Sequence, residues 1–575
     1  MDEQANTTRR LAGGVFSFLA LAAILAFIFA YRKHAVIIHA PSFSISFEHL
    51  PYYAFCSFYR MLAAYLIALA FSIPYGMMAA RGGLWERILI PAVDIAQSVP
   101  VVGFFPAAIF FFVALAHGSR LGVEMAAIFL VFTSQAWNMT LGVYEAVKTI
   151  PVDSSEILEA FGSSGWLRFK RLLMPACVPK LVYNSILSWV AGWYFLTACE
   201  IIAVGPANYR LPGLGSFLME AANDGQNGQM VLGLATMIAV IVAMHIIVWE
   251  PLSTWSEKFK YEFAASGATV ASAGMLGALG TIGPRLMRVF RAILLPPYRA
   301  ITSALEQLPS VPALSSKPAR QFYAYARGFA VAALAILFAY AIVDGMVAMV
   351  RELLQPWPPE ARQIPDAAVA STLRMIIAYA ISLAWTLPCA LAASESARFT
   401  RWLTPTAQIV GAVPATALFP FMVVLLIKAT GGMNVASVLL ILTGMQWYLL
   451  FNLLAGVNQL PEDLKEAARA FGLSRLARWR KLTIPALMPS LITGSLTAWG
   501  GGWNALIVSE YVTYRHQTYT VTGLGELLED ATFRTGNGLM ILLSLLSMVA
   551  VVIVLNRLIW RRLYEFSTER FRLDY

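Results

Sequence analysis

The stretch EAARAFGLSRLARWRKLTIPALMP, residues 466–489, is a compact basic segment between two long apolar runs. Glu466 and the alanines that follow it favour a helix, whereas Gly472 supplies the backbone freedom that a helix end needs. Four basic residues come next, and Pro485 then introduces the second apolar run. This order predicts a helix, a glycine turn and a second short helix, lying against one face of a membrane.

The composition is that of a membrane protein. The chain has 575 residues, of which 59% are hydrophobic and 13% are charged, whereas soluble domains carry about a quarter charged residues. Twelve apolar segments are long enough for a helix to cross a hydrocarbon layer of about 30 Å. They lie at 13–31, 52–80, 99–116, 123–145, 183–204, 229–249, 326–350, 369–392, 407–427, 433–456, 488–511 and 538–558. We therefore expect an all-α polytopic protein with about twelve transmembrane helices.

The formal net charge of +10 reports orientation, because lysine and arginine concentrate on the cytoplasmic side of membrane proteins. A cytoplasmic N-terminus places the quoted segment and the basic linker on that side. We expect both termini in the cytoplasm, membrane lipid as a partner, and no nucleic acid. The basic part of the linker 256–325 either lies on the anionic lipid surface or is a plain tether.

The chain contains one pattern twice. Arg60 recurs as Arg374, which is 314 residues later, and after a loop of different length Glu200 recurs as Glu510 at a spacing of 310. Other pairs at these two spacings are Pro91 and Pro405, Pro100 and Pro414, Asn138 and Asn452, Glu156 and Glu466, Gly162 and Gly472, Pro175 and Pro485, and Trp193 and Trp503. The chain is therefore a tandem duplication.

Six segments in each repeat make both repeats cross the membrane in the same sense. Two such repeats are related by a pseudo-twofold axis along the membrane normal, and a pathway then lies at their interface. This arrangement is typical of transport proteins.

Several catalytic and metal-binding motifs do not occur. The 575 residues contain no GxxxxGK[ST] phosphate-binding loop, no HExxH and no GxSxG motif. The four cysteines show no CxxC pattern, and the six histidines are scattered. We therefore expect a chain that is not itself an enzyme, hydrolyses no ATP and holds neither a metal ion nor a cofactor of its own.

EAARAFG and the Ile-Pro-Ala that follows it resemble the EAA loop of the inner-membrane permeases of ABC importers. The patterns FNLLAGVNQLPEDLKEAARAFG and WNMTLGVYEAV are similar to the nitrate, sulfonate and taurine branch of that family. In the family this loop forms the coupling helix that inserts into a groove of the ATPase subunit. The resemblance thus implies an ATPase-coupling role for Glu156, Gly162, Pro175, Glu466, Ala467, Ala468, Gly472 and Pro485.

The first copy, EILEAFGSSGWLRFKRLLMPA at 156–176, departs from the family pattern. Ile157 and Leu158 stand where the second copy has Ala467 and Ala468. We expect a second, bulkier coupling unit. Whether the two units engage identical ATPase subunits equally well stays open.

The resemblance implies a type I importer permease with both membrane halves fused in one chain of the bacterial inner membrane. Its domains are a helix and periplasmic loop at 1–50, a first permease domain at 51–255, the linker 256–325, a helix and periplasmic loop at 326–368, and a second permease domain at 369–575. The implied partners are two ABC ATPase subunits, which bind ATP and Mg²⁺, and a periplasmic solute-binding protein. The imported solute is small and often anionic in this branch. The alternative is an ion-coupled secondary transporter.

Glu200 and Glu510 stand at equivalent places near the ends of two apolar runs, where a carboxylate needs a compensating environment. One hypothesis is structural: each caps backbone donors of its own loop, or pairs with Arg210 or Arg515. The other places them on the translocation pathway. The other candidate pathway residues are Trp193, Trp503, Asn138 and Asn452.

Overall fold

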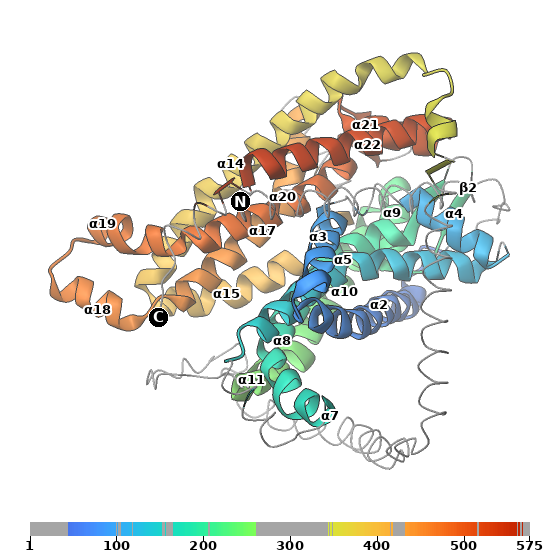
Figure 1. Cartoon of the computed structure of the whole chain (residues 1–575). Helices are drawn as coiled ribbons and strands as arrows, with labels where there is room; N and C mark the ends of the chain where they lie inside the picture. The colour runs from blue at the N-terminus through green and yellow to red at the C-terminus, as the bar shows by residue number, and fades with distance from the viewer. Residues whose placement is uncertain are drawn as a thin grey trace, which may run out of the picture.

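The computed structural model describes residues 44–259 and 343–566, with gaps at 99–100, 102–104, 118, 152–155, 157–164, 205–206, 344–345, 348, 415, 418–421, 423–431, 515–516, 561 and 564–565. The predicted helix at 13–31 and the linker from residue 260 onward lie outside the described residues. The predicted helix at 326–350 lies outside them for most of its length. The described part is mostly helical (Figure 1).

The first half begins with a short helical turn at Phe47–His49. Its further elements are α2 (Leu50–Ala79), α3 (Gly83–Ser98), α4 (Phe105–Leu115), α5 (Arg120–Lys148), α7 (Gly165–Arg168), α8 (Met174–Glu200), β1 (Ile201–Val204), β2 (Ala207–Arg210), α9 (Leu214–Asn223), α10 (Asn227–Met244) and α11 (Glu250–Ser256). One π-helical turn, Phe169–Leu173, leads into α8, and a second, His245–Trp249, follows α10.

The second half repeats this order. After a turn at Pro359–Gln363 come α14 (Ile364–Glu395), α15 (Ala397–Ala412), α17 (Met433–Gln459), α18 (Glu462–Ala470), α19 (Arg475–Arg478), α20 (Ile484–Glu510), β3 (Tyr511–Tyr514), β4 (Gln517–Thr520), α21 (Leu524–Glu529) and α22 (Gly538–Leu555). π-Helical turns again precede the long helix, at Trp479–Thr483, and follow the last one, at Asn556–Trp560. The duplication in the sequence is therefore a duplication of structure.

Six helical segments among the described residues are long and apolar enough to cross a membrane. They are Phe47–Ala79, Arg120–Lys148, Asn227–Phe259, Pro359–Glu395, Met433–Asn458 and Gly538–Trp560. Three belong to each half, and all six coincide with segments that the sequence predicts. Each span is an uninterrupted run of helical residues, which satisfies its backbone hydrogen bonds within lipid.

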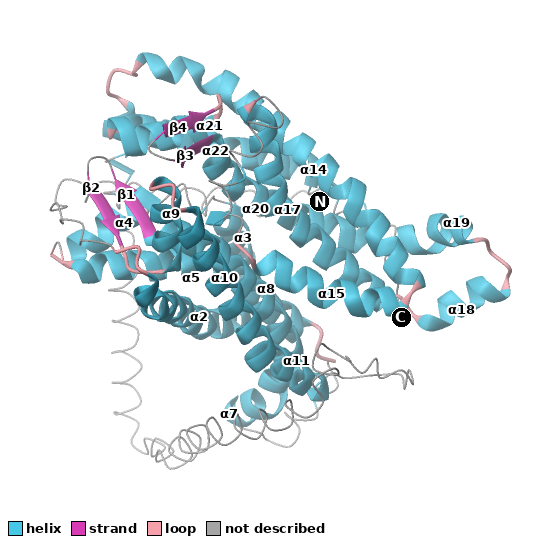
Figure 2. Cartoon of the chain, turned by 180° about the vertical axis from the view of Figure 1, so that it is seen from behind, coloured by secondary structure: helices cyan, strands magenta, loops and turns pink. Residues whose placement is uncertain are grey.

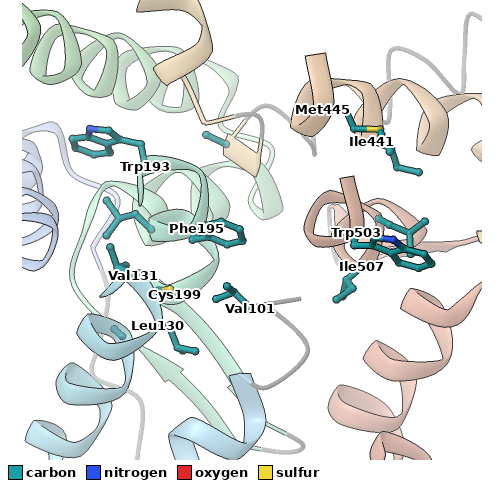
Figure 3. Packing of buried hydrophobic residues seen from close by; sticks show 14 of the residues in the cluster. Val101, Leu130, Val131, Trp193, Phe195, Cys199, Ile441, Met445, Trp503 and Ile507 are labelled. Carbon is teal, nitrogen blue, oxygen red and sulfur yellow. The ribbon is translucent and has the colours of Figure 1, made fainter. Parts of the chain in front are cut away.

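Small residues bring the long helices of each half together. A Cβ at Gly76 of α2 would lie 2.8 Å from Val143 of α5, and one at Gly501 of α20 would lie 2.4 Å from the Gly444 carbonyl of α17. Such close approach is typical of helix packing in membranes, where dispersion contacts replace the hydrophobic effect. The buried cluster runs across both halves and includes Trp193 and Trp503 (Figure 3).

A β-hairpin directly follows α8 in the first half and α20 in the second. β1 pairs with β2 in antiparallel register from Ile201↔Arg210 to Val204↔Ala207, and β3 pairs with β4 from Tyr511↔Thr520 to Tyr514↔Gln517. The sequence analysis does not predict these strands. Both hairpins lie at one end of the molecule, and α18 and α19 lie at the other (Figure 2).

Candidate functional site

The second basic segment has the helix, glycine turn and helix that its sequence predicts. α18 carries Glu462 and Asp463 in its first turn, where carboxylates complement the helix dipole. Gly472 lies in the turn after α18 and has a φ of 66°, in the left-handed region, where a residue with a side chain is strained. No described atom lies within 4 Å of the place where its Cβ would be. Backbone conformation, rather than lack of space, therefore requires glycine here.

This helical unit presents apolar side chains to its surroundings. Phe471 is 83% exposed and Leu476 is 63% exposed. Among the residues predicted from the family pattern, Glu466 and Ala467 are exposed, whereas Ala468 is buried within the unit itself. Sequence reasoning did not choose Phe471 as a site residue, although Phe161 stands 310 residues before it, at the spacing of the duplication. We call the segment 462–478 the second coupling unit, after the role that the family resemblance predicts for it.

Arg478 attaches the second coupling unit to α14. Its Nε and Nη2 donate to the two carboxylate oxygens of Glu395 at 3.2 and 2.6 Å, and its Nη1 donates to the Leu473 carbonyl at 2.9 Å. Hydrogen bonding to Glu395 raises the pKa of the Arg478 guanidinium above its usual value. The two-pronged geometry fixes orientation as well as charge. α19 is thereby held against the last residue of a membrane-spanning helix.

The first coupling segment is described only in part. Glu156 is exposed, and Gly162 lies outside the described residues. Pro175 and Pro485 are the second residues of α8 and α20, a place where a helix tolerates a missing amide hydrogen. Both prolines therefore mark where the basic segment passes into a long helix.

Glu200 lies in a buried hydrogen-bond cluster at the hairpin end of α8. It accepts from Ser57 Oγ at 2.6 Å, from Arg60 Nη1 at 2.9 Å and from the Gly215 amide at 2.7 Å. Arg60 also donates to Glu124 through Nε and Nη2, both at 2.7 Å. The side chains of Glu200 and Arg60 are 0% and 1% exposed. The glutamate is thus paired and fully bonded, as a buried charge must be.

Glu510 has the same surroundings in the second half. It accepts from Ser371 Oγ at 2.8 Å, from Arg374 Nη1 at 2.6 Å and from the Gly525 amide at 2.8 Å. Arg374 donates through Nε and Nη2 to Asn434 instead of to a carboxylate. The two halves therefore hold Glu200 and Glu510 alike. They differ in the other side chain that the arginine binds, which is Glu124 in the first half and Asn434 in the second.

The Gly-Leu-Gly sequences close over these two carboxylates. A Cβ at Gly213 would lie 2.2 Å from Glu200, and one at Gly523 would lie 2.1 Å from Glu510. Because both glycines are extended, the requirement is close approach rather than backbone strain. Each glutamate accepts from a backbone amide of its own loop. Its ion-pair partner is an arginine of α2 or α14. Arg515 and the side chain of Arg210, which the structural hypothesis named, lie outside the described part of the chain.

The other candidate pathway residues are two tryptophans of α8 and α20 and two asparagines of α5 and α17. Trp193 and Trp503 are 0% and 1% exposed and belong to the core. Asn138 of α5 is partly buried, and Asn452 of α17 donates to the Tyr448 carbonyl at 2.9 Å, which is a bond within its own helix.

Two hydrogen bonds join the halves beside the tryptophans. The Val101 amide donates to Asn504 Oδ1 at 2.6 Å, and Thr416 Oγ1 donates to the Tyr194 carbonyl at 2.8 Å. Tyr194 and Asn504 are equivalent positions, 310 residues apart, and each follows its tryptophan directly. The donors come from the duplicated proline segments. Sequence reasoning found those segments as repeats but did not find that each reaches the opposite half.

Comparison with known proteins places these features in a family. The family described as "Binding-protein-dependent transport system inner membrane component" matches residues 72–258 and 384–564, which is more than half of the chain. The nitrate import permease protein NrtB of Leptolyngbya laminosa is 26% identical over 33% of this chain and 64% of its own length. The bicarbonate transport system permease protein CmpB of Synechocystis is 24% identical over 32% of this chain and 60% of its own length.

The glycine betaine transport system permease protein OpuAB of Bacillus subtilis is 25% identical over 32% of this chain and 58% of its own length. The chain thus spans about six-tenths of the length of these relatives. The two family matches coincide with the two structural repeats and include α8 and α20, which carry Pro175 and Pro485 and the two buried glutamates. The chain therefore belongs to the family of binding-protein-dependent transport system inner membrane components and carries the domain of that family twice.

Proposed function

We propose that this chain forms both membrane halves of an ABC importer for a small solute delivered by a periplasmic binding protein. The observation that carries the proposal is the family domain present twice, each copy with its own basic segment and long helix. ATP and Mg²⁺ bind to two copies of a separate ATPase, and the binding protein docks at the hairpin end. Catalysis belongs to the ATPase, since this sequence has no phosphate-binding loop.

The full membrane domain has about twelve helices around a pseudo-twofold axis. α8 and α20, with 27 residues each, are about 40 Å long at 1.5 Å per residue, so they also reach across a bilayer. The chain crosses the inner membrane many times, and both termini are cytoplasmic because the basic loops then lie inside.

The second coupling unit docks into the ATPase. Phe471 is the apolar anchor of this contact. Its large side chain is exposed, and docking against a partner would remove it from water. Glu466 and Ala467 lie on the exposed part of α18, where a charge and a small side chain permit close contact. Gly162 and Glu156 have the corresponding role in the first unit.

The two buried glutamates have a structural role. Glu200 and Glu510 each hold a Gly-Leu-Gly loop to the first helix of their half, and an arginine forms an ion pair with each of them. A carboxylate paired with an arginine repels an anion less than an unpaired one does. This supports a pathway between the halves, near Tyr194 and Asn504, that is open to solutes such as the anions after which two relatives are named.

A reconstitution experiment tests the proposed function. The chain is expressed with the ATPase and binding protein encoded beside it, and purified in detergent. We expect one copy of the chain for each pair of ATPase subunits, and solute uptake into vesicles that requires ATP. Uptake by the chain alone, driven by an ion gradient without ATP, would identify a secondary transporter instead.

A further inference from the structure

In the second half, side-chain contacts join α14 to the continuous helical run of α19 and α20 at three levels. At the hairpin end, Glu510 of α20 binds Arg374 of α14. In the middle, Tyr379 Oη and Ser495 Oγ are hydrogen-bonded at 2.7 Å. At the coupling end, Arg478 binds Glu395. The residues from Arg475 to Glu510 form consecutive helical elements, α19, a π-helical turn and α20.

The first half repeats the first two of these levels. Glu200 binds Arg60, and Tyr65 Oη donates to Ser185 Oγ at 3.1 Å. At the third level, the constant spacings of the duplication place Arg81 where the second half has Glu395, and Arg168 where it has Arg478. Two arginines form no ion pair with each other. Positions 81 and 168 therefore do not repeat the Glu395–Arg478 pair.

The Glu395–Arg478 contact has the geometry of a positioning device. Both side chains are last residues of helices, α14 and α19, and both are less than one-fifth exposed. The same guanidinium also holds the Leu473 carbonyl, which follows Gly472 in the turn of the coupling unit. One side chain therefore joins the turn, α19 and α14. A bidentate, partly buried pair is less screened by salt than an exposed one.

We propose that Glu395 and Arg478 form a latch through which the second coupling unit moves α14 and α20 together. The inference rests on the proposed coupling function. A displacement of the second unit is then passed directly to two membrane helices. Arg478 and Glu395 are positioning residues, since neither is among the exposed residues proposed to enter the ATPase.

The test uses the complete complex of the chain, ATPase and binding protein in vesicles, and measures ATP hydrolysed per solute imported. Glu395→Gln keeps the shape and removes the charge. We expect the ratio to rise about fivefold, the scale on which one such pair shifts an equilibrium, while ATPase binding and the hydrolysis rate are retained. Arg478→Lys keeps the charge, loses the two-pronged contact and should give an intermediate ratio.

Two further variants complete the design. The exchange Glu395→Arg with Arg478→Glu restores an ion pair and should lower the ratio toward normal. Arg81→Gln is the matched control in the first half and should leave it unchanged. An unchanged ratio in a folded Glu395→Gln complex, or an equal rise in Arg81→Gln, overturns the latch. If Gly472→Leu blocks transport while Glu395→Gln is normal, the latch alone fails, whereas normal transport by Gly472→Leu refutes the coupling function.

Discussion

Arg60 and Arg374 are equivalent arginines of the two halves, and they bind different side chains. Arg60 is shared between two carboxylates, Glu124 and Glu200, whereas Arg374 is shared between Glu510 and the amide of Asn434. The buried pair and the glycine loop above it are therefore retained in both halves. What differs is the other side chain that the arginine binds. In the first half this is Glu124, which is 26% exposed. A fully buried charge needs its partner, while a partner near the surface can be exchanged because water serves in its place.

The largest effect is expected where the halves are compared at their coupling turns. Gly472→Leu forces a side chain into the left-handed region, at a cost of about 1–2 kcal/mol, and distorts the segment that carries Phe471. We expect transport to be lost while the protein stays inserted in the membrane. Transport assays and ATPase co-purification measure this outcome.

Gly472→Asn is the control for this variant, because asparagine tolerates the left-handed conformation. It should keep most of the transport. The parallel change Gly162→Leu is expected to act in the same direction, less severely, since the first unit already departs from the family pattern. An equal loss in both halves would show that the two units are alike.

The second effect concerns the buried arginines. Removing one member of a buried pair leaves an uncompensated charge and costs about 3–5 kcal/mol. We expect Arg60→Gln to lower the unfolding temperature more than Arg374→Gln, since the first leaves two carboxylates together and the second leaves only one. Thermal unfolding of the purified complex would compare them. A larger loss in Arg374→Gln would contradict this account of the clusters.

A smaller effect is expected from making the first cluster like the second. Glu124→Gln places an amide beside Arg60, as Asn434 does beside Arg374. Because Glu124 is partly exposed and Glu200 still balances the charge, the loss of stability should stay near 1 kcal/mol or below. The unfolding temperature is again the measurement. A loss of stability equal to that of Arg60→Gln would mean that the carboxylate of Glu124 is essential.

The smallest effect is expected from the two bonds between the halves. Asn504→Ala removes the acceptor of the Val101 amide, and Thr416→Val removes the donor to the Tyr194 carbonyl. Each change removes about 1 kcal/mol of net hydrogen bonding. If these bonds hold the observed arrangement of the halves, each variant should alter the basal ATPase rate of the complex without changing its assembly. Basal rates equal to those of the unchanged protein in both variants would refute that role.

Much of the architecture could be read from the chain alone. Apolar runs of membrane-crossing length predict the six spans that the structure describes, because a helix is the form in which a single segment satisfies its backbone in lipid. The two spacings predict a duplicated fold, and the Glu466 to Gly472 pattern predicts its helix and turn. The spans and the helical turn depend on residues that are near one another in the sequence, and the duplication is recognised because such local patterns occur twice.

The partners of the charged side chains were decided only by the tertiary structure. Arg210 and Arg515 are near the glutamates in sequence, yet Arg60 and Arg374 pair with them across 140 and 136 residues. Other contacts of this kind are Glu395 with Arg478, Thr416 with Tyr194, and Val101 with Asn504. Local patterns determine which segments become helices, but the packing of those helices determines which charges meet, because a buried charge binds the partner that the fold brings to it.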